Sequence, residues 1–162
     1  MTKKTYLPSY VVLALILGLS AFQSPVFGNS VDEILQKAEP PVGVVFEIAS
    51  GQADTLRKTI PIVQKHVQRL RERFPDLEIA VVTHGKEQFS LTQKNKKNYA
   101  GVHQQIQSLV KDAKVPVHVC ETYAGWKNID ASEFPDYVDV AAAGPAQIND
   151  YRELGYILIK LK

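Results

Sequence analysis

The chain has 162 residues with 19 basic and 17 acidic side chains, which gives a formal net charge of +2. This near balance excludes the one-sided basic surface with which proteins bind a phosphate backbone, so we expect no nucleic-acid partner. The chain contains one cysteine, Cys120. No disulfide can therefore form within the chain, although exported proteins often depend on them.

The first 28 residues have the pattern of a secretory signal peptide. Lys3 and Lys4 precede an apolar run over 11–21, and a polar break then leads to the small-residue exit at 26–28. The run is shorter than the roughly 20 apolar residues of a spanning helix. We therefore expect cleavage after Gly28, a periplasmic location and no membrane contact of the mature chain; an uncleaved anchor is the alternative.

The remainder is predicted to be an N-terminal extension over 29–41 and one α/β domain over 42–162. Five short segments of that domain are rich in β-branched residues and apolar on both faces, which is typical of strands buried in a parallel sheet. They are residues 42–50, 77–85, 115–120, 137–144 and 156–161.

Helices are predicted between these strands. From Leu56 to Phe74 apolar residues recur every three or four positions, which is the period of one helix face. Pro61 lies inside this pattern and is expected to kink the helix. Shorter helices are predicted over 102–110 and from Thr122 onward.

A last helix is predicted from Pro145 to just before Gly155, because proline suits the first helical turn and glycine the residue after the last.

The alternation of strands and helices predicts a three-layer α/β/α sandwich with a mostly parallel five-stranded sheet. The sequence has no glycine-rich nucleotide fingerprint, so no cofactor is predicted.

The polar stretch 86–98 is long for a connection in a compact domain, so we expect it to be either functional or loosely held. Its lysines could draw anions such as thiosulfate toward the sheet, or they could simply lie in a solvated loop. They are Lys86, Lys94, Lys96 and Lys97.

The candidate site residues lie where predicted strands end. The second strand ends at His84 and the third at Cys120. Ligands of parallel sheets bind at the carboxyl ends of the strands, so we expect a solvent-exposed Cys120 thiol as nucleophile and His84 as its proton partner. The helix start after Cys120 favours a thiolate, whereas the charge of Glu121 opposes it.

Each of these residues also has a purely structural interpretation. Cys120 could be a small buried hydrophobe, and His84 a loop imidazole hydrogen-bonded to the backbone. His118 shares a strand face with Cys120 and is expected to pack or hydrogen-bond locally, while His66 and His103 are expected at the surface. A metal site of Cys120, His84 and His118 lacks the spacing of clustered ligand pairs, so no metal is assigned.

Four stretches, VVFEIASG, LRERFPDLEIAVVTHG, VPVHVCETYAGW and FPDYVDVAAAGPAQINDYRELGYILI, resemble the DsrE/DsrF (YchN-like) family of small α/β proteins associated with sulfur oxidation and sulfur relay. The similarity runs from about Val42 to Ile159. Its most specific elements are the strand-end cysteine with the short helix after it, and the late QINDYRELGY segment. The resemblance implies a DsrEFH-like three-layer fold, assembly into trimers or hexamers, and a persulfide on the strand-end cysteine, here Cys120.

Two functional hypotheses follow. In the first, the protein is a sulfur carrier or sulfurtransferase-like protein. The Cys120 thiolate takes sulfane sulfur from thiosulfate, polysulfide or a donor protein, holds it as a persulfide and yields it to an acceptor thiol. In the second, the protein is a non-catalytic assembly module that binds a small ligand or a metal. A thiol–disulfide partner would need a resolving cysteine from another chain.

Overall fold

The computed structural model describes Met1 and residues 30–161. Nearly all of the predicted signal peptide lies outside the described residues, so its cleavage, the anchor alternative and the periplasmic location stay predictions. Among the helices of residues 30–161, none combines the length and the apolar character that a bilayer-spanning helix needs.

A five-stranded sheet forms the centre of the fold, in the order β4-β3-β2-β1-β5. All neighbouring strands run parallel, which confirms the predicted parallel sheet. Phe46, in the inner strand β1, pairs with Val81 of β2 on one side and Ile159 of β5 on the other. The strands are β1 (Gly43–Ile48), β2 (Glu78–Thr83), β3 (Val117–Cys120), β4 (Asp139–Ala141) and β5 (Tyr156–Leu161).

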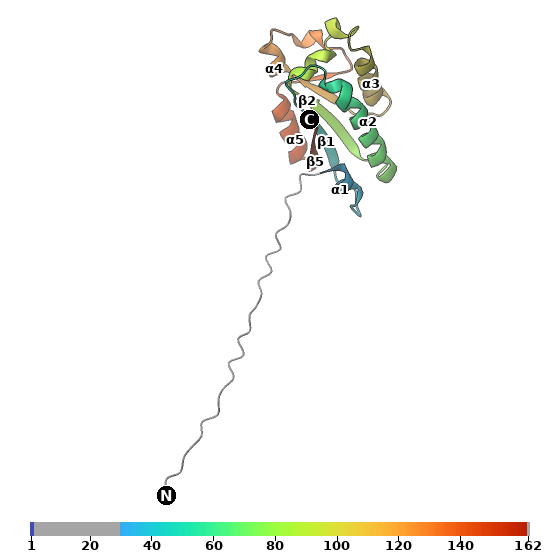
Figure 1. Ribbon diagram of the computed structural model, residues 1–162, viewed down its shortest axis with the longest axis vertical. Helices are drawn as coiled ribbons and strands as arrows, with labels where there is room; N and C mark the ends of the chain where they lie inside the picture. The colour runs from blue at the N-terminus through green and yellow to red at the C-terminus, as the bar shows by residue number, and fades with distance from the viewer. Residues whose placement is uncertain (2–29, 162) are drawn as a thin grey trace.

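Helices cover both faces of the sheet, as predicted for a three-layer sandwich, with α2 and α3 on one side and α5 on the other (Figure 1). The larger core lies under the first group, because their apolar stripes meet the alternate residues of β1, β2 and β3. The helices are α1 (Val31–Leu35), α2 (Thr55–Arg73), α3 (Ala100–Lys111), α4 (Glu121–Gly125) and α5 (Gly144–Glu153).

The smaller core lies between α5 and the opposite face of the sheet, where Ile148 meets Val45, Ala80 and Val82. α5 has proline in its first turn and is followed by Gly155 at φ 94°, a left-handed conformation that favours glycine. α1, within the predicted N-terminal extension, contributes buried side chains to the larger core.

The structure changes two of the predicted elements. β4 covers three residues of the expected 137–144, because Tyr137 and Val138 pack into the core before it and Ala143 already caps α5. Residues 86–98 contain two short 3₁₀ helices, η1 (Lys86–Leu91) and η2 (Gln93–Asn95). Five side chains of this stretch are buried, so the prediction of a loosely held loop was wrong, although its four lysines are exposed as expected.

Candidate functional site

Cys120 is the last residue of β3 and also the N-cap of α4. Its Sγ accepts a hydrogen bond from the backbone N–H of Tyr123 at 3.4 Å. A donor at this position stabilises negative charge on sulfur. The residue is nevertheless only 4% exposed. The predicted strand-end position holds, but the expectation of a solvent-exposed thiol was wrong, and the alternative of a small buried residue agrees with the structure.

Gln88 fixes the backbone of Cys120. Its side-chain Oε1 accepts from the Cys120 N–H at 2.7 Å, and its Nε2 donates to the Cys120 carbonyl at 3.2 Å. A primary amide carries one acceptor and a donor group side by side, so it satisfies both backbone groups at the end of a strand. Gln88 is fully buried, and the end of β3 is therefore held from η1.

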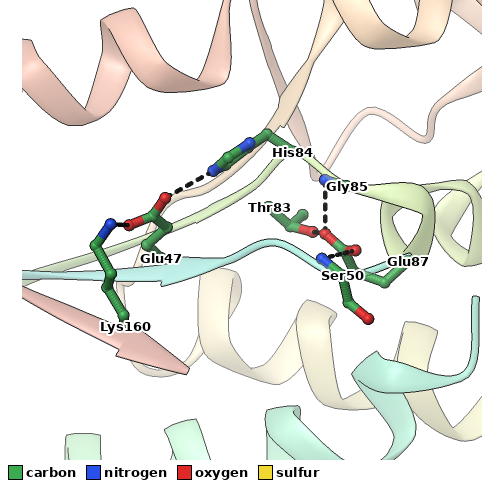
Figure 2. A network of polar contacts seen from close by, with 7 residues as sticks. All are labelled: Glu47, Ser50, Thr83, His84, Gly85, Glu87 and Lys160. Atoms are coloured by element: carbon green, nitrogen blue, oxygen red, sulfur yellow. Dashed lines mark hydrogen bonds and ion pairs between the residues drawn. The ribbon is translucent and has the colours of Figure 1, made fainter. Parts of the chain in front are cut away.

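The neighbouring residue, Glu87, binds the ends of β1 and β2 in the same way. Its buried carboxylate accepts from Thr83 Oγ1 at 2.6 Å, the Gly85 N–H at 2.8 Å and the Ser50 N–H at 2.7 Å (Figure 2). Gly85 cannot be replaced here, because a Cβ would lie 2.4 Å from Glu87 Oε2. Two consecutive residues of η1 therefore hold the ends of three adjacent strands, in a stretch predicted to be either functional or loosely held.

A second group of polar side chains lies on the sheet: His84, Glu47 and Lys160 are linked in a row (Figure 2). His84 Nε2 lies 3.0 Å from Glu47 Oε1, and Lys160 Nζ lies 3.1 Å from Glu47 Oε2. Burial raises the pKa of Glu47, but the hydrogen bonds and charges of His84 and Lys160 lower it more, so the net pKa is below the ordinary value. This strand was predicted to be apolar on both faces, and the role of Glu47 was not predicted.

His84 and Cys120 come together around Gly144, the first residue of α5. A Cβ at Gly144 would lie 2.4 Å from the Cβ of His84 and 3.4 Å from the Cβ of Cys120. The predicted proximity of the two side chains is therefore present. Within residues 30–161 no hydrogen bond joins them, and the role of His84 as a proton partner stays a prediction.

His118 confirms its expected local role. Its Nε2 lies 2.8 Å from the Tyr151 hydroxyl, on the face that α5 covers. Burial lowers the pKa of His118, and Asp139, at 3.9 Å from Nδ1, opposes this only in part. The imidazole is thereby favoured in its neutral form.

The expected surface positions of the two helical histidines were wrong. His103 is 2% exposed and bonds to the Tyr137 hydroxyl and, at 3.0 Å, to the Ser90 carbonyl. It lies three residues before Ile106 on the inward face of α3, a spacing that could have revealed its burial. His66 is half-buried and stacks on Phe46.

Among residues 30–161, no three side chains of His, Cys, Asp or Glu are arranged as metal ligands. A cavity of about 470 Å³ lies at the opposite rim of the sheet from Cys120, where β2 and β5 begin. Tyr151 and Tyr156 line it, together with Arg71, Glu78 and Lys114.

No protein-family model matches the chain, and no curated protein matches its sequence. Solved structures do resemble it. MTH1491 from Methanobacterium thermoautotrophicum, a protein of unknown function, is 19% identical with a TM-score of 0.58, and the match covers 73% of this chain and 97% of that one. The ychN protein of E. coli is 13% identical with a TM-score of 0.52, covering 74% of this chain and 99% of the other.

A third structure, the conserved protein of unknown function BT1422 from Bacteroides thetaiotaomicron, is 13% identical with a TM-score of 0.51 and covers 72% and 94% of the two chains. At these identities the matches show a common fold. The chain thus has the YchN-like α/β architecture that the sequence resemblance implied, with a parallel five-stranded sheet flanked by helices.

Proposed function

We propose that this protein is a sulfur carrier of the DsrE/DsrF type, which holds sulfane sulfur as a persulfide on Cys120. The observation that carries the proposal is the hydrogen bond from the Tyr123 N–H to Cys120 Sγ at the end of β3. This bond brings a backbone donor to the sulfur, and a thiolate is the nucleophile that accepts sulfur and the leaving group that releases it. The YchN-like fold supports the same function.

The loading step balances without a redox cofactor. The Cys120 thiolate attacks the sulfane sulfur of thiosulfate, the S–S bond of thiosulfate breaks, and its electron pair leaves with sulfite. The product is the persulfide anion of Cys120. In the unloading step an acceptor thiolate attacks the outer sulfur, and Cys120 leaves as a thiolate.

The burial of Cys120 means that a substrate reaches the thiol only when the rim opens. α4 is the element suited to this movement, because it is five residues long and is followed by the 73%-exposed Trp126. Its hydrogen bonds to the segment after β4 run from the N–H and hydroxyl of Thr122 to the Ala142 carbonyl. Short peripheral elements of this kind open at a lower free energy than the core.

The proposal extends to the surroundings in which the protein works. As an exported, periplasmic protein it would exchange sulfur with small sulfur compounds or with donor and acceptor proteins, and by its resemblance it would assemble as a trimer or hexamer. The test of assembly is the molar mass in solution, measured by light scattering. A monomer at micromolar concentration would contradict this part of the proposal.

Intact mass spectrometry tests the carrier function. The purified protein is incubated with thiosulfate or polysulfide, and wild type is compared with Cys120→Ser, in which the hydroxyl keeps an N-cap acceptor. We expect a gain of about 32 Da per sulfur atom in wild type alone, and its loss on reduction. An alkylatable thiol that never gains this mass would contradict the proposal.

The second candidate function is a small-ligand binding module. The burial of Cys120 and the cavity lined by Tyr151 and Tyr156 favour it. If the protein is such a module, Cys120→Ser should leave ligand binding in this cavity unchanged. Tyrosine fluorescence during titration with small aromatic acids would measure occupancy of the cavity.

A further inference from the structure

Glu47 is a partly buried carboxylate that the proposed sulfur chemistry does not use. It lies in β1 between apolar residues, and its side chain is 14% exposed. An ionised carboxylate in such a place costs free energy unless it is paired and hydrogen-bonded. Buried titratable groups with a specific charge partner are concentrated at functional sites.

The two partners of the Glu47 carboxylate determine which ring nitrogen of His84 carries the hydrogen. Lys160 contacts Oε2 of Glu47, which leaves Oε1 for the ring of His84 (Figure 2). Because the two partners lower the pKa of Glu47, its carboxylate is ionised near neutral pH and can only accept hydrogen bonds. His84 Nε2 must therefore be the protonated nitrogen, and Nδ1 of the neutral ring carries the lone pair.

The other end of the same side chain lies against Gly144. His84 packs against Gly144 so closely that a Cβ there would lie 3.0 Å from its Cγ, the atom to which Nδ1 is bonded. The same point lies 3.4 Å from the Cβ of Cys120. The His84 side chain thus extends from the carboxylate of Glu47 to Gly144, where the Cβ of Cys120 also lies.

We propose that Glu47 is a positioning residue that holds His84 as the Nε2–H tautomer, so that Nδ1 takes the proton of the Cys120 thiol. This inference rests on the proposed function and names the group that ionises its nucleophile. A nucleophile, a base and a third group that orients the base form the arrangement by which weak nucleophiles are activated.

The proton step is balanced as follows. The S–H bond of Cys120 breaks, its electron pair stays on Sγ, and the proton passes to Nδ1 directly after the rim opens or through one water molecule. The imidazolium is paired with the Glu47 carboxylate. The thiolate attacks thiosulfate, and His84 returns the proton to the departing sulfite.

The residues around the His84 side chain come from β1, β5, β3 and α5. Glu47 faces the ring from β1, Lys160 lies behind it on β5, and Cys120 ends β3. α5 brings Gly144, which carries no charge. The nearby carboxylate of Glu87 is already occupied by two backbone N–H groups and a hydroxyl.

NMR of the ¹⁵N-labelled protein tests the positioning role without any sulfur chemistry. In wild type at neutral pH we expect the ring shifts of His84 to report a protonated Nε2 and an unprotonated Nδ1. Glu47→Leu removes the acceptor and should give a mixture of tautomers, while Glu47→Gln, which keeps an oxygen acceptor, should restore part of the preference. Asp150→Asn removes one exposed acid and should change nothing. An unchanged tautomer in Glu47→Leu would overturn the inference.

The rate of alkylation of Cys120 tests the proton transfer, and it needs no sulfur donor. The rate at pH 7 is divided by the rate at about pH 10, where a thiol ionises without help, so that the cost of opening the rim cancels. We expect this ratio to fall about tenfold or more in Glu47→Leu and in His84→Ala, and the double variant to lose no more than His84→Ala.

These outcomes separate the inference from the proposed function. Equal alkylation ratios in wild type and Glu47→Leu, with persulfide still formed in wild type, would refute the inference and leave the sulfur carrier intact. A ratio that depends on Glu47, with no persulfide in any variant, would refute the carrier and support the positioning role. Thermal unfolding of each variant verifies that it is folded.

Discussion

Gln88 and Cys120 are joined by two hydrogen bonds, one to each backbone group of the cysteine. The position of Cys120 is thus determined through its main chain, which η1 holds, and its sulfur adds one weaker contact with Tyr123. The proposed function requires α4 to move away from the sulfur, and η1 would hold the strand end in place as it does so. A reactive group on a fixed backbone under a movable cover is the arrangement on which the proposed function depends.

Replacing Gln88 by leucine should destabilise the fold by about 2 to 4 kcal/mol, because the buried N–H and carbonyl of Cys120 would both lose their partner. Chemical denaturation measures the free energy of unfolding. Gln104→Leu is the matched control, since Gln104 is exposed on α3, and it should change stability by less than about 0.5 kcal/mol. Equal effects of the two substitutions would contradict the role of Gln88.

Glu87→Gln should lower the free energy of unfolding by about 2 to 4 kcal/mol. The carboxylate accepts from Thr83, Gly85 and Ser50, and an amide nitrogen in its place would face donors and leave one of them unpaired. The comparison is with Glu39→Gln, which alters an exposed acid. If both variants unfold at the wild-type denaturant concentration, the three strand ends are not held through Glu87.

Gly144→Ala should displace His84, because the added Cβ would lie 2.4 Å from the Cβ of His84. We expect a loss of about 1 to 3 kcal/mol of stability and a changed ring signal of His84 in NMR spectra. The control is Gly101→Ala in α3, where a Cβ would meet nothing within 4 Å and alanine favours a helix over glycine. That variant should be as stable as wild type or more so. The reverse order of stability would refute the packing described at Gly144.

Stability should decrease when the pH is lowered from about 7 to 5, the range in which unperturbed histidines take up protons. Burial lowers the pKa of both His103 and His118 in the folded state. Below about pH 6.5 the unfolded chain therefore binds more protons than the folded one, and protonation favours unfolding. Glu47, whose folded pKa is lowered, adds stability that is present above about pH 4.3 and lost as the pH falls further.

Urea denaturation at a series of pH values measures this dependence. His103→Gln removes one of the two buried imidazoles and should make the decrease between about pH 7 and 5 shallower. A wild-type stability that is constant or rises over this range would show that these histidines are protonated in the folded protein.

The strands and helices were predictable because their signals are periodic. The apolar run of β1 and the three-to-four spacing of α2 identify both elements, and Pro145 with Gly155 locates both ends of α5. The positions of His84 and Cys120 at one rim followed from the rule that parallel strands end together.

The polar residues that build the rim could not be predicted in the same way. Glu87 and Gln88 lie in a stretch of mixed polar residues, and composition does not distinguish a solvated glutamine from one that binds a strand end. Glu47 is one charged residue in an apolar strand, and its partners His84 and Lys160 are identified only by their positions in the structure. The burial of Cys120 depends on how α4 folds back, which no local pattern describes.

The central claim is that Cys120 reacts from the folded protein, through movement of the rim. Its most direct test compares the rate of alkylation of Cys120 with the rate of global unfolding, both measured at pH 7 on the same sample. We expect alkylation to be much faster than unfolding and to persist at low denaturant, where the whole fold is stable. Alkylation that proceeds only at the rate of global unfolding would contradict it, because the thiol would then be a sealed part of the core.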